Sequence, residues 1–249
     1  MLRYLCRSTP EDIAARMNVT LLIPTLNELE GLKVIMPRVE KIFSGQILFV
    51  DGGSTDGTLK FLADGGYQYI VQKKLGLQNG LREAMSSVTG DVVITFSPDN
   101  NSIPELIPDL IKKMEEGYDM VIVSRYKDGA ISEDDDLLTA FGNWFFTKTI
   151  NLLFGSTYTD AMVMYRAFKA DLPHRLGLDR QESYGLEERL FHTRISWDPL
   201  MSVRCAKQKF MVGEIAGDEP RRTGGKRKLQ IVKWGCAYYF SIWKEYIRR

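Results

Sequence analysis

The sequence is poor in the residues that build disulfide frameworks and zinc sites. Its three cysteines, Cys6, Cys205 and Cys236, are widely separated and form no CxxC pair. Its two histidines, His174 and His192, have no neighbouring His, Cys or carboxylate at ligand spacing. These absences argue against a disulfide-stapled fold and against a zinc cluster, and they favour a reducing compartment.

Long apolar runs and a net charge of one sign are also missing. No run approaches the ~20 apolar residues that span a bilayer, and the N-terminal segment MLRYLCRSTPEDIAARMN lacks the apolar region of a signal peptide. Lys and Arg total 33 against 32 for Asp and Glu, so no global attraction draws the chain to nucleic acid or acidic lipid. We expect a cytoplasmic protein without a nucleic-acid partner, which contacts the inner face of the cell membrane only peripherally.

Strand-like and helix-like segments alternate through the first half of the 249 residues. This rhythm predicts one α/β unit with a mostly parallel sheet and right-handed crossovers. Pro37 predicts a kink or break in the first helix, and Ser102 is a candidate N-cap for the helix that begins near Pro104. The expected strands are 19–23, 46–50, 67–71, 92–96 and 120–124, and the expected helices are 29–43, from 58, 78–87 and 104–116.

After residue 124 the pattern changes. An acidic loop at 132–136 precedes a long apolar helix over about 138–154, and strand-like segments follow at 162–168 and 203–215 around a helix near 184–195. We expect a globular domain over 1–225 and a C-terminal amphipathic arm over 226–249, because apolar residues recur there at helical spacing. The arm would pack on the core, on a second subunit of a homo-oligomer, or on a membrane surface. Its apolar residues are Leu229, Val232, Cys236, Tyr239, Phe240, Trp243 and Ile247.

Polar loops follow the second and fourth expected strands. DGGSTDGT at 51–58 can bind a nucleotide base or sugar, or it can be an ordinary turn in which Asp51 and Asp56 cap the next helix. SPDNN at 97–101 is either a surface turn or a ligand site, because open α/β sheets bind ligands beyond the carboxyl ends of their strands.

The order of these loops resembles the family 2 glycosyltransferases of the GT-A fold. IPTLNE at 23–28 is similar to their PxYNE segment, with Leu26 in place of Tyr, and DGGSTDGT matches their second-strand motif. SPDNNSIPE lies where dolichol-phosphate mannose synthase-like members, a polyprenyl-phosphate glycosyltransferase subgroup, have a DxD before a Pro-Glu helix start. SRYKDG, TDAMVMYRAF and RRTGGKRKL resemble later segments of that subgroup, although the second lacks its Ser-Gly pair, which leaves the acceptor open.

The resemblance implies a metal-dependent, inverting hexosyltransferase that uses a UDP- or GDP-sugar and Mg²⁺ or Mn²⁺. The implied acceptor is a polyprenyl phosphate or a cell-envelope glycan precursor. Asp99 would face the metal with Asn101 as a polar ligand nearby, and Ser97 replaces the first carboxylate of the DxD. The other implied donor-binding residues are Pro24, Glu28 and Asp51 around the nucleoside, Pro98 beside Asp99, and Arg125, Arg222 and Lys228 around phosphate.

The implied catalytic residues are Asp99 and Arg125, with Asp160 and Glu187 as candidate general bases; Glu188 is not separable from Glu187 by sequence. Each position has an ordinary structural alternative. Arg125 can pair with the acidic loop at 133–136 and Asp160 can hold a loop. Glu28 can cap a helix and Glu187 can be a solvated carboxylate.

Two other functional classes remain beside the transferase. The Ser97 replacement allows an inactive sugar-nucleotide-binding or scaffold protein of the same fold. A sugar-phosphate nucleotidyltransferase would need a Gly-rich, basic loop after the first strand, and IPTLNELEG does not supply one. A Rossmann dehydrogenase is excluded because no GxGxxG follows a strand. The sugar, the base, the acceptor and the oligomeric state stay open.

Overall fold

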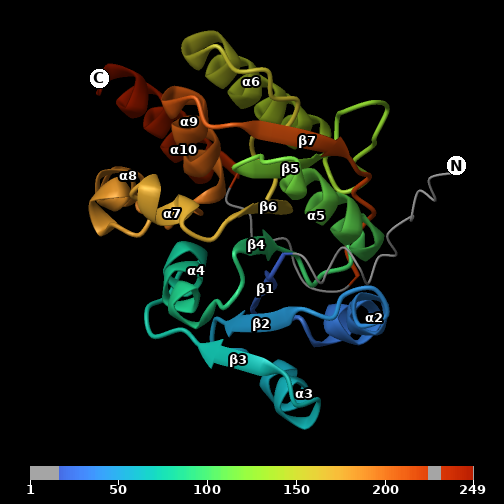
Figure 1. The fold of residues 1–249 in the computed structure, drawn as a ribbon. Coiled ribbons are helices and arrows are strands. Elements are labelled where there is room, and N and C mark those ends of the chain that lie inside the picture. The colour runs from blue at the N-terminus through green and yellow to red at the C-terminus, as the bar shows by residue number, and fades with distance from the viewer. Residues whose placement is uncertain (1–16, 224–230, 249) are drawn as a thin grey trace, which may run out of the picture.

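The computed structural model describes residues 17–223 and 231–248, and these contain a seven-stranded sheet in the order β3-β2-β1-β4-β6-β5-β7 (Figure 1). All neighbouring strands are parallel except β6, which is antiparallel to both β4 and β5. The expected parallel α/β architecture is therefore confirmed. The strands are β1 (Val19–Thr25), β2 (Gln46–Asp51), β3 (Gln68–Val71), β4 (Val92–Thr95), β5 (Met120–Ser124), β6 (Arg166–Lys169) and β7 (Val212–Ala216).

Helices cover both faces of this sheet. Successive residues of a strand point to opposite faces, so Leu21 and Ile23 pack under α2 and α5 while Leu22 packs in the core formed by α4, α6, α9 and α10. Both faces are buried, as parallel sheets require. The α-helices are α2 (Leu29–Val39), α3 (Thr58–Asp64), α4 (Leu77–Ala84), α5 (Ile107–Glu115), α6 (Leu137–Phe154), α7 (Leu172–Arg175), α8 (Gly185–Phe191), α9 (Asp198–Gln208) and α10 (Ile231–Ile247); short 3₁₀ turns lie at Met85–Ser87, Pro104–Leu106 and Gln181–Ser183.

Several predicted boundaries are wrong for local reasons. Helix α2 ends at Val39, two residues after Pro37, and does not continue to 43. Ser102 does not cap a helix: the turn at Pro104–Leu106 has Ile103 at its N-cap position, and the Ser102 hydroxyl accepts a bond from the Ser97 amide at 3.4 Å.

The strand predicted over 203–215 is helical in its first part. Helix α9 continues to Gln208, and β7 begins only at Val212. Residues Asp198 to Ala206 are buried throughout, and a segment buried on all sides has no periodicity that separates helix from strand. The strand predicted over 162–168 likewise begins only at Arg166.

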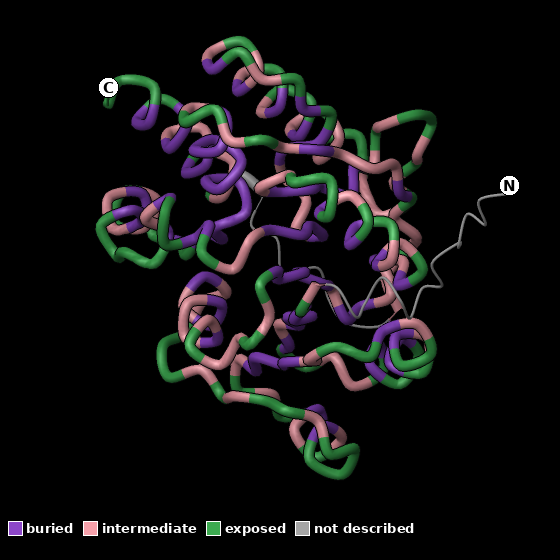
Figure 2. The backbone as a smooth tube through the Cα atoms, in the orientation of Figure 1, coloured by how far each residue is buried: buried purple, intermediate pink, exposed green. Residues whose placement is uncertain are grey.

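Helix α10 packs against α6, α8 and α9, but with only part of the predicted apolar stripe: the Tyr239 ring packs on Phe145 and the Phe240 ring on Phe191. Its buried residues include Ala237, Tyr238 and Ile242, whereas Trp243 and Ile247 are exposed. Figure 2 shows buried and exposed stretches alternating along the C-terminal end of the chain. Leu229 and the predicted boundary at 225/226 lie outside the described residues. Among the described helices, none has both the length and the apolarity needed to cross a bilayer.

Buried ion pairs explain the orientation of α10. Lys244 contacts Glu187 of α8, and Glu245 bonds Arg204 of α9 at 2.7 Å. Because these charged side chains turn inward to meet partners, the aromatic residues beside them turn outward.

Candidate functional site

The loop after β2 is a hydrogen-bonded turn centred on Asp51. Its Oδ1 accepts the amides of Gly53 and Ser54 at 2.8 and 2.7 Å. Its Oδ2 accepts the hydroxyls of Thr25 and Ser54 at 2.8 and 2.6 Å. Four bonds occupy the acceptor positions of the carboxylate, so Asp51 holds the turn in this structure. This matches the alternative in which Asp51 shapes the loop, and its expected place beside the nucleoside stays a prediction.

The loop after β1 is fastened to the same turn. Asp56 accepts the Thr58 amide at 2.9 Å and the Leu29 amide at 3.1 Å. Partial burial acts to raise the pKa of the Asp56 carboxyl, but the bonds from Thr58 and Leu29 outweigh it and hold the pKa below its usual value. Glu28 occupies the N-cap position of α2 without a side-chain cap bond, and Pro24 pairs with Val50 inside the sheet.

The loop after β4 holds Asp99 at the carboxyl end of a central strand. The Ser97 hydroxyl donates to Asp99 Oδ1 at 2.6 Å, and the Arg222 guanidinium lies 3.7 Å from Oδ2. The Thr223 amide donates to the Asp99 carbonyl at 2.7 Å. Ser97 thus orients the remaining carboxylate instead of supplying a second one.

This loop packs tightly against α2. A Cβ on Gly31 would lie 2.3 Å from the carbonyl oxygen of Pro98, so only glycine allows the approach. Asn100 adopts a left-handed conformation with φ 67° and donates to the Thr223 hydroxyl at 3.0 Å. Helix α2 and Thr223 together therefore fix the loop that carries Asp99.

Few of the described protein groups near Asp99 could bind a metal ion. A cation held there would therefore take most of its ligands from substrate phosphates and water. Among residues 17–223 and 231–248, no group of three or more His, Cys, Asp or Glu side chains is arranged to hold a metal. Asn101 lies near, but its amide Nδ2 points to Glu219 at 3.4 Å. Mg²⁺ and Mn²⁺ bind through one or two carboxylates plus substrate phosphates and waters, so Asp99 fits such an ion when a diphosphate is present.

Arg125 is the centre of the adjoining charged cluster. Its guanidinium donates to both oxygens of Asp160, at 2.6 and 3.2 Å, and to Glu219 at 3.0 Å. Asp135 lies 3.6 Å away, as the pairing with the acidic loop predicted. Burial acts to lower the pKa of Arg125, but the charges of Asp160 and Glu219 outweigh it, so the pKa is raised and the guanidinium is fixed as a cation.

Asp160 is fully buried and serves as the anchor of Arg125. Its Oδ1 also accepts the Asn143 amide at 3.1 Å and the Met162 amide at 3.2 Å. Burial acts to raise the pKa of Asp160, but the Arg125 charge and the bonds from Arg125 and the Met162 amide lower it overall. A carboxylate with a depressed pKa and occupied lone pairs is a poor general base, so the geometry supports its alternative role as a holding residue.

Glu187 does not reach this cluster. It is buried between α8 and α10, where it contacts Lys244 and accepts the Ser241 hydroxyl at 2.7 Å. This contact favours a structural role over the predicted catalytic one, and residue spacing could not reveal it because Lys244 lies 57 positions further along the chain. Arg222 does reach the site, where it bonds Asp134 at 2.6 Å. Lys228 lies outside the described residues.

Glu219 is the functional candidate that the sequence reasoning missed. It follows β7 and contacts Arg125, Asn101 and the Ser132 hydroxyl. Burial raises the pKa of the Glu219 carboxyl against the opposing Arg125 charge. Its position one loop beyond a parallel strand was the available signal, because that edge of the sheet carries the other site residues.

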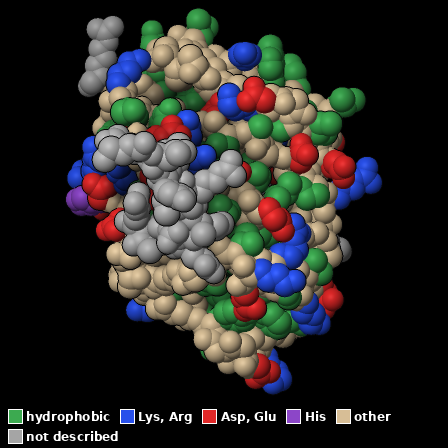
Figure 3. Space-filling model, turned by 45° about the vertical axis from the view of Figure 1, so that its right-hand side comes forward, with side chains coloured by type: hydrophobic (Ala, Val, Ile, Leu, Met, Phe, Trp, Pro, Cys, Tyr) green, Lys and Arg blue, Asp and Glu red, His purple; other side chains and the backbone are tan. Residues whose placement is uncertain are grey.

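A pocket of about 340 Å³ opens beside Arg125; we call it the Arg125 pocket. Its charged lining consists of Arg125, Asp134, Asp135, Asp198, Glu219 and Arg222, and its apolar lining includes Leu77, Leu138, Phe146, Met162, Trp234 and Tyr238. One cavity therefore joins the charged cluster to the α6 and α10 helices. On the face shown in Figure 3, basic and acidic side chains are interspersed, and they form no large patch of one sign.

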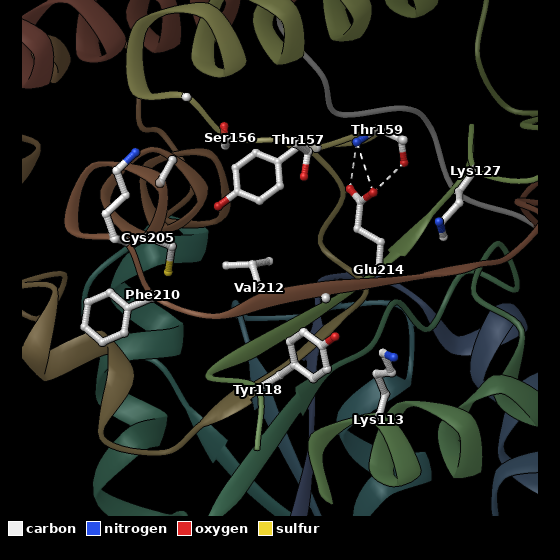
Figure 4. A pocket seen from close by; sticks show the side chains of 15 residues that line it. Lys113, Tyr118, Lys127, Ser156, Thr157, Thr159, Cys205, Phe210, Val212 and Glu214 are labelled. Atoms are coloured by element: carbon white, nitrogen blue, oxygen red, sulfur yellow. Dashed lines mark hydrogen bonds between the residues drawn. The ribbon is translucent and has the colours of Figure 1, made fainter. Parts of the chain in front are cut away.

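A second hollow of about 500 Å³ lies at the edge of the sheet along β7 (Figure 4). There Glu214 accepts the Thr159 amide at 2.8 Å and the Asp160 amide at 3.2 Å. Burial raises the pKa of Glu214. This contact holds the backbone of Asp160 and so supports the charged cluster.

Comparisons with known proteins agree with this architecture. The sequence model of glycosyl transferase family 2 matches residues 20–175, more than half of the chain. Glycosyltransferase AglJ of Haloferax volcanii is 25% identical over 231 residues, which cover 91% of this chain and 71% of that protein. Dolichol-phosphate mannosyltransferase of Pyrococcus furiosus is 32% identical over 126 residues, 47% of this chain and 36% of that protein.

A solved structure of glucosyl-3-phosphoglycerate synthase from Mycobacterium tuberculosis superposes with a TM-score of 0.66 at 17% identity, covering 96% of this chain and 84% of that chain. This likeness shows the GT-A fold. The strand-end loops, the charged cluster and the family match lead to one conclusion: the chain belongs to glycosyl transferase family 2.

Proposed function

We propose that this protein transfers a sugar, with inversion, from a UDP- or GDP-sugar to the phosphate of a polyprenyl lipid. The observation that carries the proposal is the Arg125 pocket, which joins a charged cluster to an apolar lining. A lipid phosphate needs both surfaces, because its head is anionic and its chain is apolar. The name of the Pyrococcus furiosus relative, a dolichol-phosphate mannosyltransferase, supports this acceptor class.

The hydrogen bonding of Asp160 and the burial of Glu187 favour a phosphate acceptor over a hydroxyl acceptor. A hydroxyl acceptor needs a general base, whereas a phosphate is already anionic near neutral pH. Asp160 is bonded on both oxygens and Glu187 is buried between two helices. A glycan hydroxyl acceptor remains the second candidate, because Glu219 has a raised pKa beside Arg125 and would be its base.

The leaving nucleoside diphosphate would be stabilised by Arg125 and Arg222. Negative charge develops on the diphosphate as the glycosidic bond breaks, and preorganised cations stabilise that charge. Asp99, oriented by Ser97, would hold a divalent cation with Asn101 nearby; such a cation supplies further positive charge at the diphosphate. The solved glucosyl-3-phosphoglycerate synthase was crystallised with Mn²⁺ and UDP-glucose, which supports a divalent metal and a nucleotide-sugar donor.

An apolar surface beside the pocket supports peripheral membrane contact. Leu138, Phe141 and Trp144 of α6 are 59%, 59% and 55% exposed. The rings of Phe145 and Tyr239 lie 5.1 Å apart and join α6 to α10. Aromatic and aliphatic side chains on adjacent helices suit the interfacial layer of a bilayer, so we propose that α6 docks there together with the C-terminal helix. A second copy of the chain is the alternative occupant.

The proposal is tested by measuring transfer directly. Purified protein, Mn²⁺ and radiolabelled UDP- and GDP-sugars would be incubated with anionic vesicles that contain undecaprenyl or dolichyl phosphate. We expect label to enter the lipid phase only when the lipid phosphate is present. Transfer to water or to a free glycan, with none to the lipid, would refute this acceptor.

A scaffold role is the rival reading of the Ser97 replacement. Slow donor hydrolysis or transfer by the wild-type protein that disappears in Asp99→Asn would exclude that role. Nucleotide binding without any turnover, in the presence of either metal and either lipid, would favour it.

A further inference from the structure

Two buried side chains in the Arg125 pocket have an oxygen without a hydrogen-bond partner among the described residues. They are Asn143 Oδ1 on α6 and Asp198 Oδ1 at the start of α9. The two residues are 5% and 2% exposed, and both line the pocket. Buried acceptors of this kind are rare in folded proteins because an unpaired polar atom is costly.

The orientation of the Asn143 amide is fixed by its neighbour. Its Nδ2 donates to Asp160 Oδ1 at 3.1 Å, and a carboxylate such as Asp160 only accepts. Rotating the amide would place two acceptors against each other. Asn143 Oδ1 is therefore the oxygen left to meet a donor from elsewhere.

Asp198 also has a carboxylate oxygen that accepts no hydrogen bond from the described part of the chain. The Ser196 hydroxyl donates to its Oδ2, while the Arg166 guanidinium nitrogen lies 3.8 Å from its Oδ1, beyond hydrogen-bond distance. Arg166 Nη1 instead bonds the Asp198 carbonyl at 2.9 Å and the Ser202 hydroxyl at 3.0 Å. Asp198 Oδ1 can thus accept one more hydrogen bond.

The ligand that satisfies these oxygens must carry hydrogen-bond donors. An isoprenoid chain has none, and a diphosphate at Arg125 has only acceptors near neutral pH. A sugar ring has several hydroxyl donors, and its C–H faces can pack on the aromatic side chains Phe146, Trp234 and Tyr238 that line the same pocket. Asn143 is one hydrogen bond from Asp160, which in turn holds Arg125, so a sugar there would lie beside the diphosphate.

We propose that the buried end of the Arg125 pocket is the subsite for the transferred sugar, whose hydroxyl groups donate to Asn143 and Asp198. This inference rests on the proposed function, and it makes these two residues determinants of which sugar is accepted. The lipid would reach the sugar from the exposed end of the pocket, where Leu138 lies.

Gly142 offers a position from which a larger side chain can fill the pocket. It lies on α6 and lines the pocket, and a Cβ there would meet, apart from its chain neighbours and the backbone of the helix, one atom within 4 Å, the Phe146 ring at 3.9 Å. Gly142→Leu would extend into the subsite, whereas Gly142→Ala is the matched control that adds only a methyl group. Both changes replace a helical glycine, which favours the helix.

The experiment compares each nucleotide with its sugar form. Calorimetry with Mn²⁺ would measure UDP against UDP-glucose and UDP-N-acetylglucosamine, and GDP against GDP-mannose, on wild type, Gly142→Ala, Gly142→Leu and Asn143→Leu. In wild type we expect one sugar nucleotide to bind more tightly than its nucleoside diphosphate. Gly142→Leu should abolish that gain, and Asn143→Leu should reduce it about three- to tenfold, the effect of one hydrogen bond. The affinity for the nucleoside diphosphate should stay within about twofold of wild type in Gly142→Leu.

Two results would overturn the inference, and they differ from failure of the proposed function. If UDP or GDP binds and Gly142→Leu keeps the full gain for the sugar nucleotide, the sugar lies elsewhere. If Gly142→Leu and Asn143→Leu change the affinity of every sugar nucleotide no more than that of its nucleoside diphosphate, the subsite does not exist. If neither nucleotide binds wild type, the proposed function fails and the inference fails with it.

Discussion

Replacing Asp160 by Asn should destabilise the protein strongly, because it removes the main anionic partner of a nearly buried guanidinium. Arg125 would keep Glu219 at 3.0 Å and Asp135 at 3.6 Å but lose its bidentate bonds. Removing one partner of a buried pair costs about 3–5 kcal/mol. For a protein of this size that corresponds to a fall in Tm of about 6–20 °C.

The lowered pKa of Asp160 predicts that the stability of the protein depends on pH. The folded-state pKa of Asp160 is lowered, since the opposing effect of burial is outweighed by Arg125, so it lies below the unfolded value of about 3.9. The Asp160 contribution to stability is therefore fully present above pH ~3.9 and is lost as the pH falls through the folded-state value. The Asp160→Asn variant should lack this part of the acid destabilisation.

Urea unfolding followed by circular dichroism between pH 3 and pH 7 would measure both effects. Asp64→Asn is the matched control, because Asp64 forms an exposed pair with Lys60 at 2.7 Å and should cost about 0–1 kcal/mol. A cost for Asp160→Asn no larger than that of the control, or an unchanged acid transition, would refute the reasoning about the Arg125 cluster.

Three further outcomes follow from the site. Ser97→Asp restores a second carboxylate beside Asp99 and should raise Mn²⁺ affinity in the presence of nucleotide, measured by calorimetry; an unchanged affinity would mean that position 97 does not face the metal. Gly31→Ala places a Cβ 2.3 Å from the Pro98 carbonyl and should lower Tm and metal affinity together. An unchanged Tm and an unchanged metal affinity would show that the loop can shift to accommodate the methyl group. Glu187→Gln should lower Tm through the loss of its pair with Lys244 but leave the pH profile of turnover unchanged; a shifted profile would return Glu187 to the chemistry.

Local signals in the sequence predicted the strand and helix alternation as far as residue 124, because each apolar run there is bounded by polar turns. The resemblance to the family, and not local pattern, placed Asp99 and Arg125 together around the diphosphate.

Long-range pairing accounts for what the sequence could not predict. Glu219 contacts Arg125 across 94 positions of the chain, a separation that residue spacing does not encode. The outward face of α10 was misjudged because apolar periodicity cannot show that Lys244 and Glu245 have buried partners.

The apolar surface of α6 can be tested separately from catalysis. Trp144→Glu places a charge on an exposed position of that helix and should abolish flotation with anionic liposomes, whereas Lys60→Glu on the distant helix α3 should not. Equal flotation of Trp144→Glu and wild type would remove α6 from the membrane contact.

Calorimetric titration of Mn²⁺ tests the central claim most directly, namely that one carboxylate and a diphosphate together hold the catalytic cation. The account predicts that Mn²⁺ binds wild type tightly only when UDP or GDP is present, and that Asp99→Asn loses this binding. Equal Mn²⁺ binding with and without nucleotide, or full binding by Asp99→Asn, would contradict it.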